Sequence, residues 1–280
     1  AMDDCDTGEE KNRVKSEQIY GIEYDEKVFG LATTNMLIHG DGNSNIKQGS
    51  CFENASFIRD AKINVVLMNP PYNAKRKESN PDEVKNWEDK AKEDPSKGFH
   101  FVQYIADTVK TGKLAVLLPM QCAIGSSKEV ENFKKSMLQR HTLDAVFSYP
   151  ADMFHPGASA NACCMVFNLG VRHEKAPLQE TFFGYFKDDG FVKRKNLGRV
   201  QKIQAGKGSW KDIEEKWLSL YFNREAKQGL SVTKKVSATD EWLAEAYIET
   251  DYSTLIGKDF EKTVREFIAY QIICGENYGF

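Results

Sequence analysis

The stretch "NVVLMNPPYNAK", residues 64–75, joins an apolar run to two consecutive prolines and a tyrosine. The run, residues 63–68, is typical of a strand buried on both faces of a parallel sheet. Proline has no backbone N–H to donate to a neighbouring strand, so Pro70 and Pro71 end this strand. The residue before a proline is held in an extended conformation, which fixes the direction of Asn69. The stretch therefore predicts a stiff turn that presents an amide side chain, a backbone carbonyl and an aromatic ring.

Strand and helix patterns alternate on both sides of this turn, from residue 19 to about residue 170. The expected strands are 19–25, 45–52, 63–68, 113–119, 143–149 and 161–169, and the expected helices are 26–40, 98–112 and 128–140. Residues 75–98 are highly charged and contain two further prolines, so they predict a long loop with one helical turn. Alternation with short connections predicts an α/β fold built on a doubly wound sheet.

The ends of the chain have a different pattern. Residues 1–18 are nearly all polar and predict a disordered segment. Past residue 170 we expect a hairpin with its turn at Asp188-Asp189-Gly190, followed by helical stretches at 209–224, 239–248 and 258–273. The last stretch carries an apolar stripe, which packs either on its own domain or on a partner. The predicted organisation is thus 1–18 polar segment, 19–170 α/β domain, and 171–280 hairpin plus mostly helical extension.

The composition excludes several classes of protein. With 28% charged residues and a net charge of −3, the chain is no polybasic binder, because nonspecific phosphate binding needs clustered Lys and Arg. The six cysteines form no CxxC pair and have no histidine at metal-ligand spacing, which favours scattered reduced thiols over a metal site or disulfides. No apolar run approaches the roughly 20 residues that span a bilayer. We therefore expect a cytoplasmic protein with no metal and no membrane segment.

The tetrad Asn69, Pro70, Pro71 and Tyr72 suits methyl transfer to an exocyclic amine of a base. Such an amine is a poor nucleophile because its lone pair is delocalised into the ring. The Asn69 side-chain oxygen and the Pro70 carbonyl can accept its two protons, which favours a pyramidal nitrogen with a free lone pair. Tyr72 offers a plane on which an extruded base can stack. The alternative is an ordinary proline turn after a strand.

The tetrad resembles the catalytic motif of N6-adenine DNA methyltransferases. Three further stretches, "YGIEYDEKVFGLATTNMLIHG" (20–40), "IKQGSCF" (46–52) and "DAVFSYPADMFHPGASANACCMVFN" (144–168), resemble the modification subunits of type I restriction-modification systems. The resemblance covers roughly residues 19–170. It implies a Rossmann-like methyltransferase sheet, S-adenosylmethionine as cofactor, double-stranded DNA as substrate, and a specificity subunit and a restriction subunit as partners.

The resemblance also assigns roles to residues outside the tetrad. Glu23, at the end of its strand, would bind the ribose hydroxyls of the cofactor, as acids do in nucleotide-binding sheets. Tyr24 would line the pocket for the cofactor's adenine. Ser50 and Cys51 stand where the family normally has an aspartate that contacts the adenine amine. Phe154 would form a wall of the target-base pocket.

One part of the family pattern is missing from the sequence. The family has a glycine-rich turn after its first strand, which holds the methionine part of the cofactor. That turn belongs before residue 19, where this chain has "MDDCDTGEE". The chain thus reads as a truncated methyltransferase or as a gene product that has lost the turn. We expect the strands at 19–23 and 63–68 to pair directly or the gap between them to be filled by another chain, with residues 19–60 displaced and cofactor binding weak or absent.

Two rival functions stay open at this point. Methyltransferases of protein glutamine amides or of ribosomal RNA use the same tetrad, and a noncatalytic protein could bind DNA or assemble with a restriction complex. The basic run 187–202 and residues Lys75, Arg76 and Lys77 are the candidate phosphate contacts, although a solvated charged face would have the same pattern. The favoured prediction is an adenine N6 DNA methyltransferase.

Overall fold

Six strands form the main sheet, in the order β10-β7-β5-β6-β4-β3. The computed structural model describes residues 5–40, 45–125, 127–157, 160–202, 209–249 and 255–274. The strands of this sheet are β3 Val65–Met68, β4 Gly112–Pro119, β5 Thr142–Ser148, β6 Ala162–Leu169, β7 Thr181–Tyr185 and β10 Ser231–Lys234. β3 runs parallel to β4, and β5 parallel to β7, whereas the other three pairs are antiparallel. The sheet is therefore mixed, as part of an α/β fold.

Helices cover both faces of this sheet, because successive residues of a strand point to opposite sides. Val146 belongs to the core that contains residues of α5 and α7, whereas its neighbour Ala145 belongs to the core beneath α8. Phe183 and Phe182 divide in the same way. The helices are α5 Phe99–Val109, α7 Lys128–Leu138 and α8 Trp210–Phe222. The predicted α/β class is confirmed.

A separate two-stranded sheet precedes the main one along the chain. β1 (Tyr20–Glu23) and β2 (Asn45–Gln48) are parallel and are joined by α2 (Glu26–Ile38). Asp25 caps α2, since its carboxylate accepts from the backbone N–H groups of Lys27 and Val28. Among the described residues β1 pairs only with β2, and β3 only with β4. The direct pairing of β1 with β3, one of the two expected outcomes, is not found.

The exposure of β3 differs from the sequence-based expectation. Val66 and Met68 pack against the main core, but Val65 is 62% exposed and Leu67 is 81% exposed. Burial on both faces was therefore the wrong prediction. The physical reason is that one face of β3 opens onto a cavity and its outer edge has no neighbouring strand among the described residues.

The N-terminal segment is helical where the sequence predicts disorder. α1 (Gly8–Arg13) continues into a short π-helix, Val14–Gln18. Thr7 and Glu10 form a capping box, in which each side chain accepts from the other residue's backbone N–H. This reciprocal cap satisfies backbone donors at the helix start, although no residue of α1 is buried.

The chain beyond residue 170 contributes to the main sheet through β7 and β10. The hairpin lies at β8 (Phe191–Arg194) and β9 (Gly198–Gln201), so its turn follows residue 194 and the predicted turn at 188–190 is wrong. Residues 239–248 contain only a 3₁₀ turn, Ala244–Ala246, in place of the expected helix. The predicted helix 258–273 is confirmed as α9, Gly257–Cys274.

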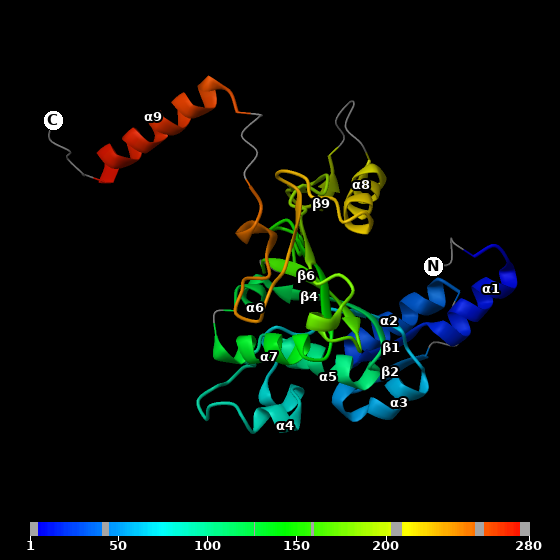
Figure 1. Ribbon diagram of the computed structural model, residues 1–280. Coiled ribbons are helices and arrows are strands. Elements are labelled where there is room, and N and C mark those ends of the chain that lie inside the picture. The colour runs from blue at the N-terminus through cyan, green and yellow to red at the C-terminus, as the bar shows by residue number, and fades with distance from the viewer. Residues whose placement is uncertain are drawn as a thin grey trace.

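α9 stands apart from the rest of the chain (Figure 1). Its apolar side chains stay exposed, with Phe260 at 55% and Phe267 at 57%. The described residues therefore leave the apolar stripe of this helix uncovered. The remaining short elements are η3 Cys51–Glu53, α3 Ala55–Asp60, η4 Arg76–Glu78, α4 Pro81–Val84, α6 Met120–Ile124 and η5 His173–Lys175.

Candidate active site

A cavity of about 880 Å³ lies between the small sheet and the free edge of β3. Its walls include all nine residues to which the sequence assigns a site role: Glu23, Tyr24, Ser50, Cys51, Asn69, Pro70, Pro71, Tyr72 and Phe154. These residues come from four separate stretches of chain. They meet because β1 and β3 both border the cavity along their whole length. The segments that follow the strands close the ends of the cavity.

Asn69 and Tyr72 contact each other at the end of β3. The Tyr72 hydroxyl donates to Asn69 Oδ1 at 3.3 Å. Burial raises the pKa of Tyr72 to about 12, with the thiols of Cys163 and Cys122 adding to the shift. The phenol is therefore neutral at physiological pH and is a hydrogen-bond donor. Asn69 is exposed and Pro70 is buried, so the turn is anchored by its proline and presents its amide to the cavity.

Glu23 closes β1 and lies at the opposite side of the cavity from β3. One of its carboxylate oxygens accepts from the backbone N–H of Asp25 at 2.8 Å, and its carbonyl accepts from Gly49 at 2.9 Å. Tyr24, the next residue, is 49% exposed and lines the same wall. A fixed carboxylate beside an accessible aromatic ring can bind two hydroxyls and a base of a nucleoside.

Ser50 and Cys51 begin the 3₁₀ turn after β2. Ser50 Oγ accepts from the backbone N–H of Phe52 at 3.3 Å, and Ser50 O accepts from Asn54 Nδ2 at 2.7 Å. Burial raises the pKa of the Cys51 thiol to about 12, so it stays protonated. Ser50 and Cys51 thus supply a neutral hydroxyl and a neutral thiol to the cavity, and the hydroxyl also caps the turn.

Phe154 belongs to a turn that the β8–β9 hairpin supports. Arg199 of β9 forms a two-pronged pair with Asp189, at 2.8 Å for each contact, and a further pair with Asp152 at 3.3 Å. Asp152 lies two residues before Phe154, so the hairpin and the pocket wall are joined by the ion pair between Arg199 and Asp152. This joint places the hairpin next to the cavity.

Some candidate phosphate contacts pair with other groups of the protein, and others are exposed to solvent. Arg76 is committed to backbone carbonyls of its own loop, and Lys187 and Lys202 pair with Glu245 and Asp188. The exposed basic residues that remain on the hairpin are Lys193, Arg194 and Lys195. Lys75 and Lys77 are exposed as well.

The charges around the cavity fit a cationic cofactor. Glu23, Asp25 and Glu78 line it, and no Lys, Arg or His does so among the described residues. Such a wall favours a group with a positive sulfonium and ammonium, as S-adenosylmethionine has, over a nucleotide phosphate. Glu23 and Tyr24 would hold the nucleoside part. Within the described residues no glycine-rich turn borders the cavity to hold the methionine part.

Two residues near this site escaped the sequence-based reasoning. Asp94 and His100 are buried and hydrogen-bonded to each other beneath the tetrad. Asp94 lies near the end of the charged stretch 75–98, and His100 lies at the start of α5. Carboxylate and imidazole groups at such positions are usually solvated. The signal that could have revealed them is the apolar surroundings of His100, between Phe99 and Phe101.

The comparisons with known proteins agree with this fold. A family model, N-6 DNA Methylase, matches residues 4–241. The type II restriction enzyme and methyltransferase RM.BcgI of Heyndrickxia coagulans is 31% identical over 274 residues, which are 95% of this chain and 39% of that protein. Release factor glutamine methyltransferase of Fusobacterium nucleatum subsp. nucleatum is 33% identical over 97 residues, which are 34% of this chain and 27% of that protein.

A solved structure shares the architecture. The type I restriction-modification system methyltransferase subunit of Streptococcus thermophilus superposes with a TM-score of 0.56 and 20% identity, over 77% of this chain and 44% of that one. The fold is thus the mixed α/β fold of methyltransferase subunits of this kind. The chain belongs to the N-6 DNA methylase family. It spans less than half the length of these relatives.

Neither a membrane-spanning helix nor a metal-binding cluster occurs among the described residues. No helix there is both long and apolar enough to cross a membrane. No group of three or more His, Cys, Asp or Glu side chains in the same residues is arranged to hold a metal ion.

Proposed function

We propose that the chain is the catalytic part of a DNA methyltransferase that modifies the N6 amine of adenine within a restriction-modification system of the cytoplasm. The observation that carries the proposal is the shared cavity: the tetrad, the nucleoside-binding candidates and Phe154 all line it. S-adenosylmethionine, when bound, supplies an electrophilic methyl group. The family membership supports the same reaction class.

The tetrad provides the acceptors that the amine needs. Asn69 Oδ1 and the Pro70 carbonyl accept the two amine protons, and the resulting pyramidal nitrogen has a free lone pair. These hydrogen bonds strengthen as positive charge develops on the nitrogen, which lowers the barrier. The methylated amine is strongly acidic and loses its proton to water, so no charged general base is needed. Tyr72 stacks on the extruded base, and Phe154 bounds its pocket.

DNA would approach over the β8–β9 hairpin. The exposed cations Lys193, Arg194 and Lys195 lie at the tip of this hairpin, which is fixed beside the Phe154 turn through Arg199. Phosphate contacts there would position the duplex, and base choice would come from a specificity subunit or target-recognition domain. The uncovered stripe of α9 is a candidate surface for such a partner or for a restriction subunit.

A methyl-transfer assay tests the proposal. The chain, or the assembly that completes its site, is incubated with S-adenosylmethionine labelled on its methyl group, and with duplex DNA, a release-factor protein or ribosomal RNA as the acceptor. We expect label in DNA, recovered as N6-methyladenine. Label confined to the protein or the RNA would overturn the proposal.

A glutamine amide is the second candidate acceptor. It is favoured by the local likeness to release factor glutamine methyltransferase and by the tetrad, whose two acceptors suit any planar amine or amide with two protons. A third outcome, no label in any acceptor despite DNA binding, would favour a noncatalytic DNA-binding or assembly role.

A further inference from the structure

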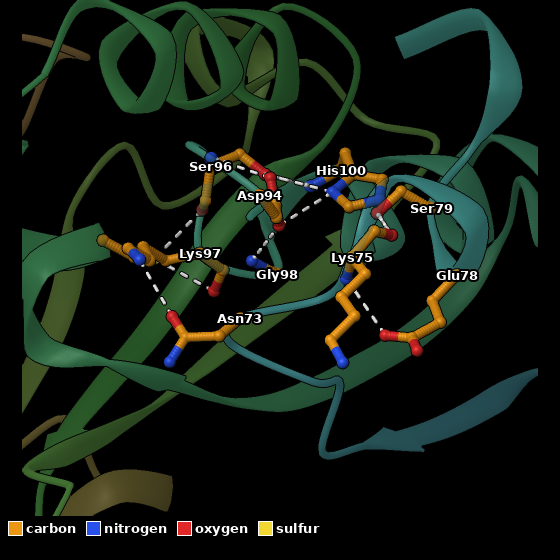
Figure 2. Close-up of polar contacts among 10 residues, drawn as sticks. Asn73, Lys75, Glu78, Ser79, Asp94, Ser96, Lys97, Gly98 and His100 are labelled. Atoms are coloured by element: carbon orange, nitrogen blue, oxygen red, sulfur yellow. Dashed lines mark hydrogen bonds and ion pairs between the residues drawn. The ribbon is translucent and has the colours of Figure 1, made fainter. Parts of the chain in front are cut away.

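The segment that follows the tetrad forms a loop whose two ends are hydrogen-bonded to each other. The backbone N–H of Asp94 donates to Ala74 O at 2.9 Å. Lys97 Nζ donates to Asn73 Oδ1 at 2.8 Å, as Figure 2 shows. Segment 73–98 therefore leaves the tetrad and returns to it. The residues at its return point lie directly against the catalytic turn.

The interior of this loop is ordered by one half-buried cation, Arg76. Arg76 donates to the carbonyls of Ala91 at 3.0 Å and Glu88 at 2.6 Å, and its guanidinium lies 5.6 Å from the centre of the Trp87 ring. These contacts satisfy backbone groups within the loop. Arg76 therefore orders the loop up to Ala91, three residues before Asp94.

Asp94 organises the return point with a fully buried carboxylate (Figure 2). One oxygen accepts from the backbone N–H and the hydroxyl of Ser96, at 2.8 and 2.7 Å. The other accepts from the backbone N–H of Gly98 at 2.6 Å and from His100 Nδ1 at 3.0 Å. Because the Ser96 proton goes to Asp94, the imidazole must carry its hydrogen on Nδ1.

These donors also keep Asp94 ionised. Burial alone would raise the pKa of the carboxyl, but the hydrogen bond and charge of His100, with the bonds from Ser96 and Gly98, lower it below the usual value. An ionised carboxylate is acceptor-only and has room for all four donors. Asparagine at position 94 would have the same size, but its side-chain NH2 group would face the groups that donate to Asp94.

Gly98 connects Asp94 to the tetrad. Its φ is +96°, and a Cβ there would lie 3.3 Å from Pro70 Cγ and 3.4 Å from Pro71 O. The two prolines have no backbone N–H with which to anchor their own turn. Packing against Gly98 is therefore one of the contacts that fix where Pro70 and Pro71 lie.

We propose that Asp94 is a positioning residue for the catalytic turn. Its carboxylate holds Gly98 against Pro70 and Pro71, and this contact sets the direction of the Asn69 side chain. The role of Asn69 in methyl transfer rests on the proposed function. The way in which Asp94 holds Asn69 in place does not depend on it. Asp94 itself does not line the cavity.

The test follows the Asn69 side-chain amide by NMR in protein labelled with ¹⁵N. Its signal is assigned by its loss in Asn69→Ser. In Asp94→Asn we expect this signal to shift or broaden, because Gly98 is no longer held. Asp89→Asn makes the same chemical change at an exposed site of the same loop and should leave the signal in place. An unchanged Asn69 signal in folded Asp94→Asn would overturn the proposal.

Two milder variants keep the test decisive if Asp94→Asn fails to fold. Ser96→Ala removes one donor of the four and should give a smaller change of the Asn69 signal. Gly98→Ala leaves Asp94 intact but pushes on Pro70, and should also move the signal. If neither variant moves it, the proposal is wrong.

Kinetics separate this inference from the proposed function. A misplaced catalytic group can cost about 100-fold in rate, so Asp94→Asn should lower kcat by that order while the KM for DNA stays within a few-fold. An unchanged kcat would overturn the positioning role. If the Asn69 signal moves but no acceptor is ever methylated, the proposed function fails and the account of how Asp94 holds the turn stands.

Discussion

Asn69 and Tyr72 share a hydrogen bond at the mouth of the cavity, and this bond bears on how each is tested. At 3.3 Å between side chains that reach solvent, it is weak, and such a bond contributes about 0.5–1 kcal/mol. The carbonyl oxygen of Asn69 has two lone pairs, so it can accept from Tyr72 and from an incoming amine together. The Tyr72 hydroxyl therefore contributes little to holding Asn69, and the main contribution of Tyr72 to the site is its ring.

We predict different outcomes for two substitutions of Tyr72. Tyr72→Ala should weaken binding of an extruded base by about 1–3 kcal/mol, because the stacking plane is lost. Tyr72→Phe should be mild, because stacking needs the ring and not the hydroxyl. Fluorescence of duplexes that carry 2-aminopurine in place of adenine measures extrusion directly. Equal damage from both variants would rule out the stacking role.

The site residues show what a sequence can and cannot reveal at this scale. Asn69 could be predicted because it directly follows β3, and Glu23 because it is the last residue of β1; the ends of both strands border the cavity. The capping role of Ser50 could not, because a hydroxyl that caps a turn and one that binds a ligand look alike in sequence. Asp94 was missed because its burial depends on Gly98 and His100, whose contacts form only in the folded chain.

At the scale of elements, the junction of β3 and β4 depends on one glycine. Gly112 has a φ of +116°, and a Cβ there would lie 2.1 Å from the Asn64 carbonyl oxygen. Gly112→Ala should destabilise the chain by about 3 kcal/mol or more, from backbone strain and overpacking together. Gly30→Ala, in α2 with open space around it, should be neutral or stabilising by up to about 1 kcal/mol. Urea unfolding of the two variants checks this, and similar effects would refute it.

Lys134 joins three elements and gives a pH-dependent prediction. Its ammonium donates to Ala123 O in α6 at 3.0 Å and to Asp240 O at 2.6 Å, and lies 4.6 Å from the centre of the Trp242 ring. Burial lowers its pKa to about 8, against the opposing effect of nearby acids such as Asp240. The unfolded chain therefore keeps this proton over a pH range in which the folded chain has lost it.

Stability linked to Lys134 should accordingly increase as pH rises above 8. We predict that the free energy of unfolding of the natural chain increases relative to that of Lys134→Met, by up to about 3 kcal/mol near pH 10. Other groups titrate in both proteins and cancel in the difference. Guanidinium unfolding at several pH values measures it. A difference that stays flat or decreases would contradict the assignment.

The elements that were wrongly predicted have local explanations. α1 was missed although Thr7 and Glu10 match the capping-box pattern, because the polar composition of residues 1–18 outweighed the cap. The hairpin was placed too early because Asp188-Asp189-Gly190 is a strong turn signal. In the structure that turn connects β7 to β8, which do not pair. Packing determines which strands pair in a sheet, and turn residues in the sequence do not predict it.

At the scale of the whole molecule, the two sheets face each other across an unfilled gap. In the described part of the chain no strand joins β1 to β3, and Val65 and Leu67 stay exposed. Exposed edge groups of this kind can pair with a strand of another segment or chain. Occupation of this gap by a further segment or chain stays a prediction.

The open gap predicts weak cofactor binding by residues 1–280 alone. Glu23 and Tyr24 can hold a nucleoside, but the described residues provide no glycine-rich turn for the methionine part. Calorimetry with S-adenosylmethionine should therefore give weak binding or none. Tight binding would contradict this prediction and would show that the cavity is sufficient as it stands.

The most direct test of the central claim is the effect of Asn69→Ala on methylation of DNA. Unmethylated genomic DNA is incubated with excess S-adenosylmethionine, and its nucleosides are analysed by mass spectrometry. We predict N6-methyladenine with the natural chain, or with the assembly that completes its site. Asn69→Ala should reduce it roughly 100- to 1,000-fold, while cofactor affinity stays within a few-fold. Undiminished N6-methyladenine with Asn69→Ala, or an equal loss of cofactor affinity and rate, would contradict the role of Asn69 as the acceptor for the target amine.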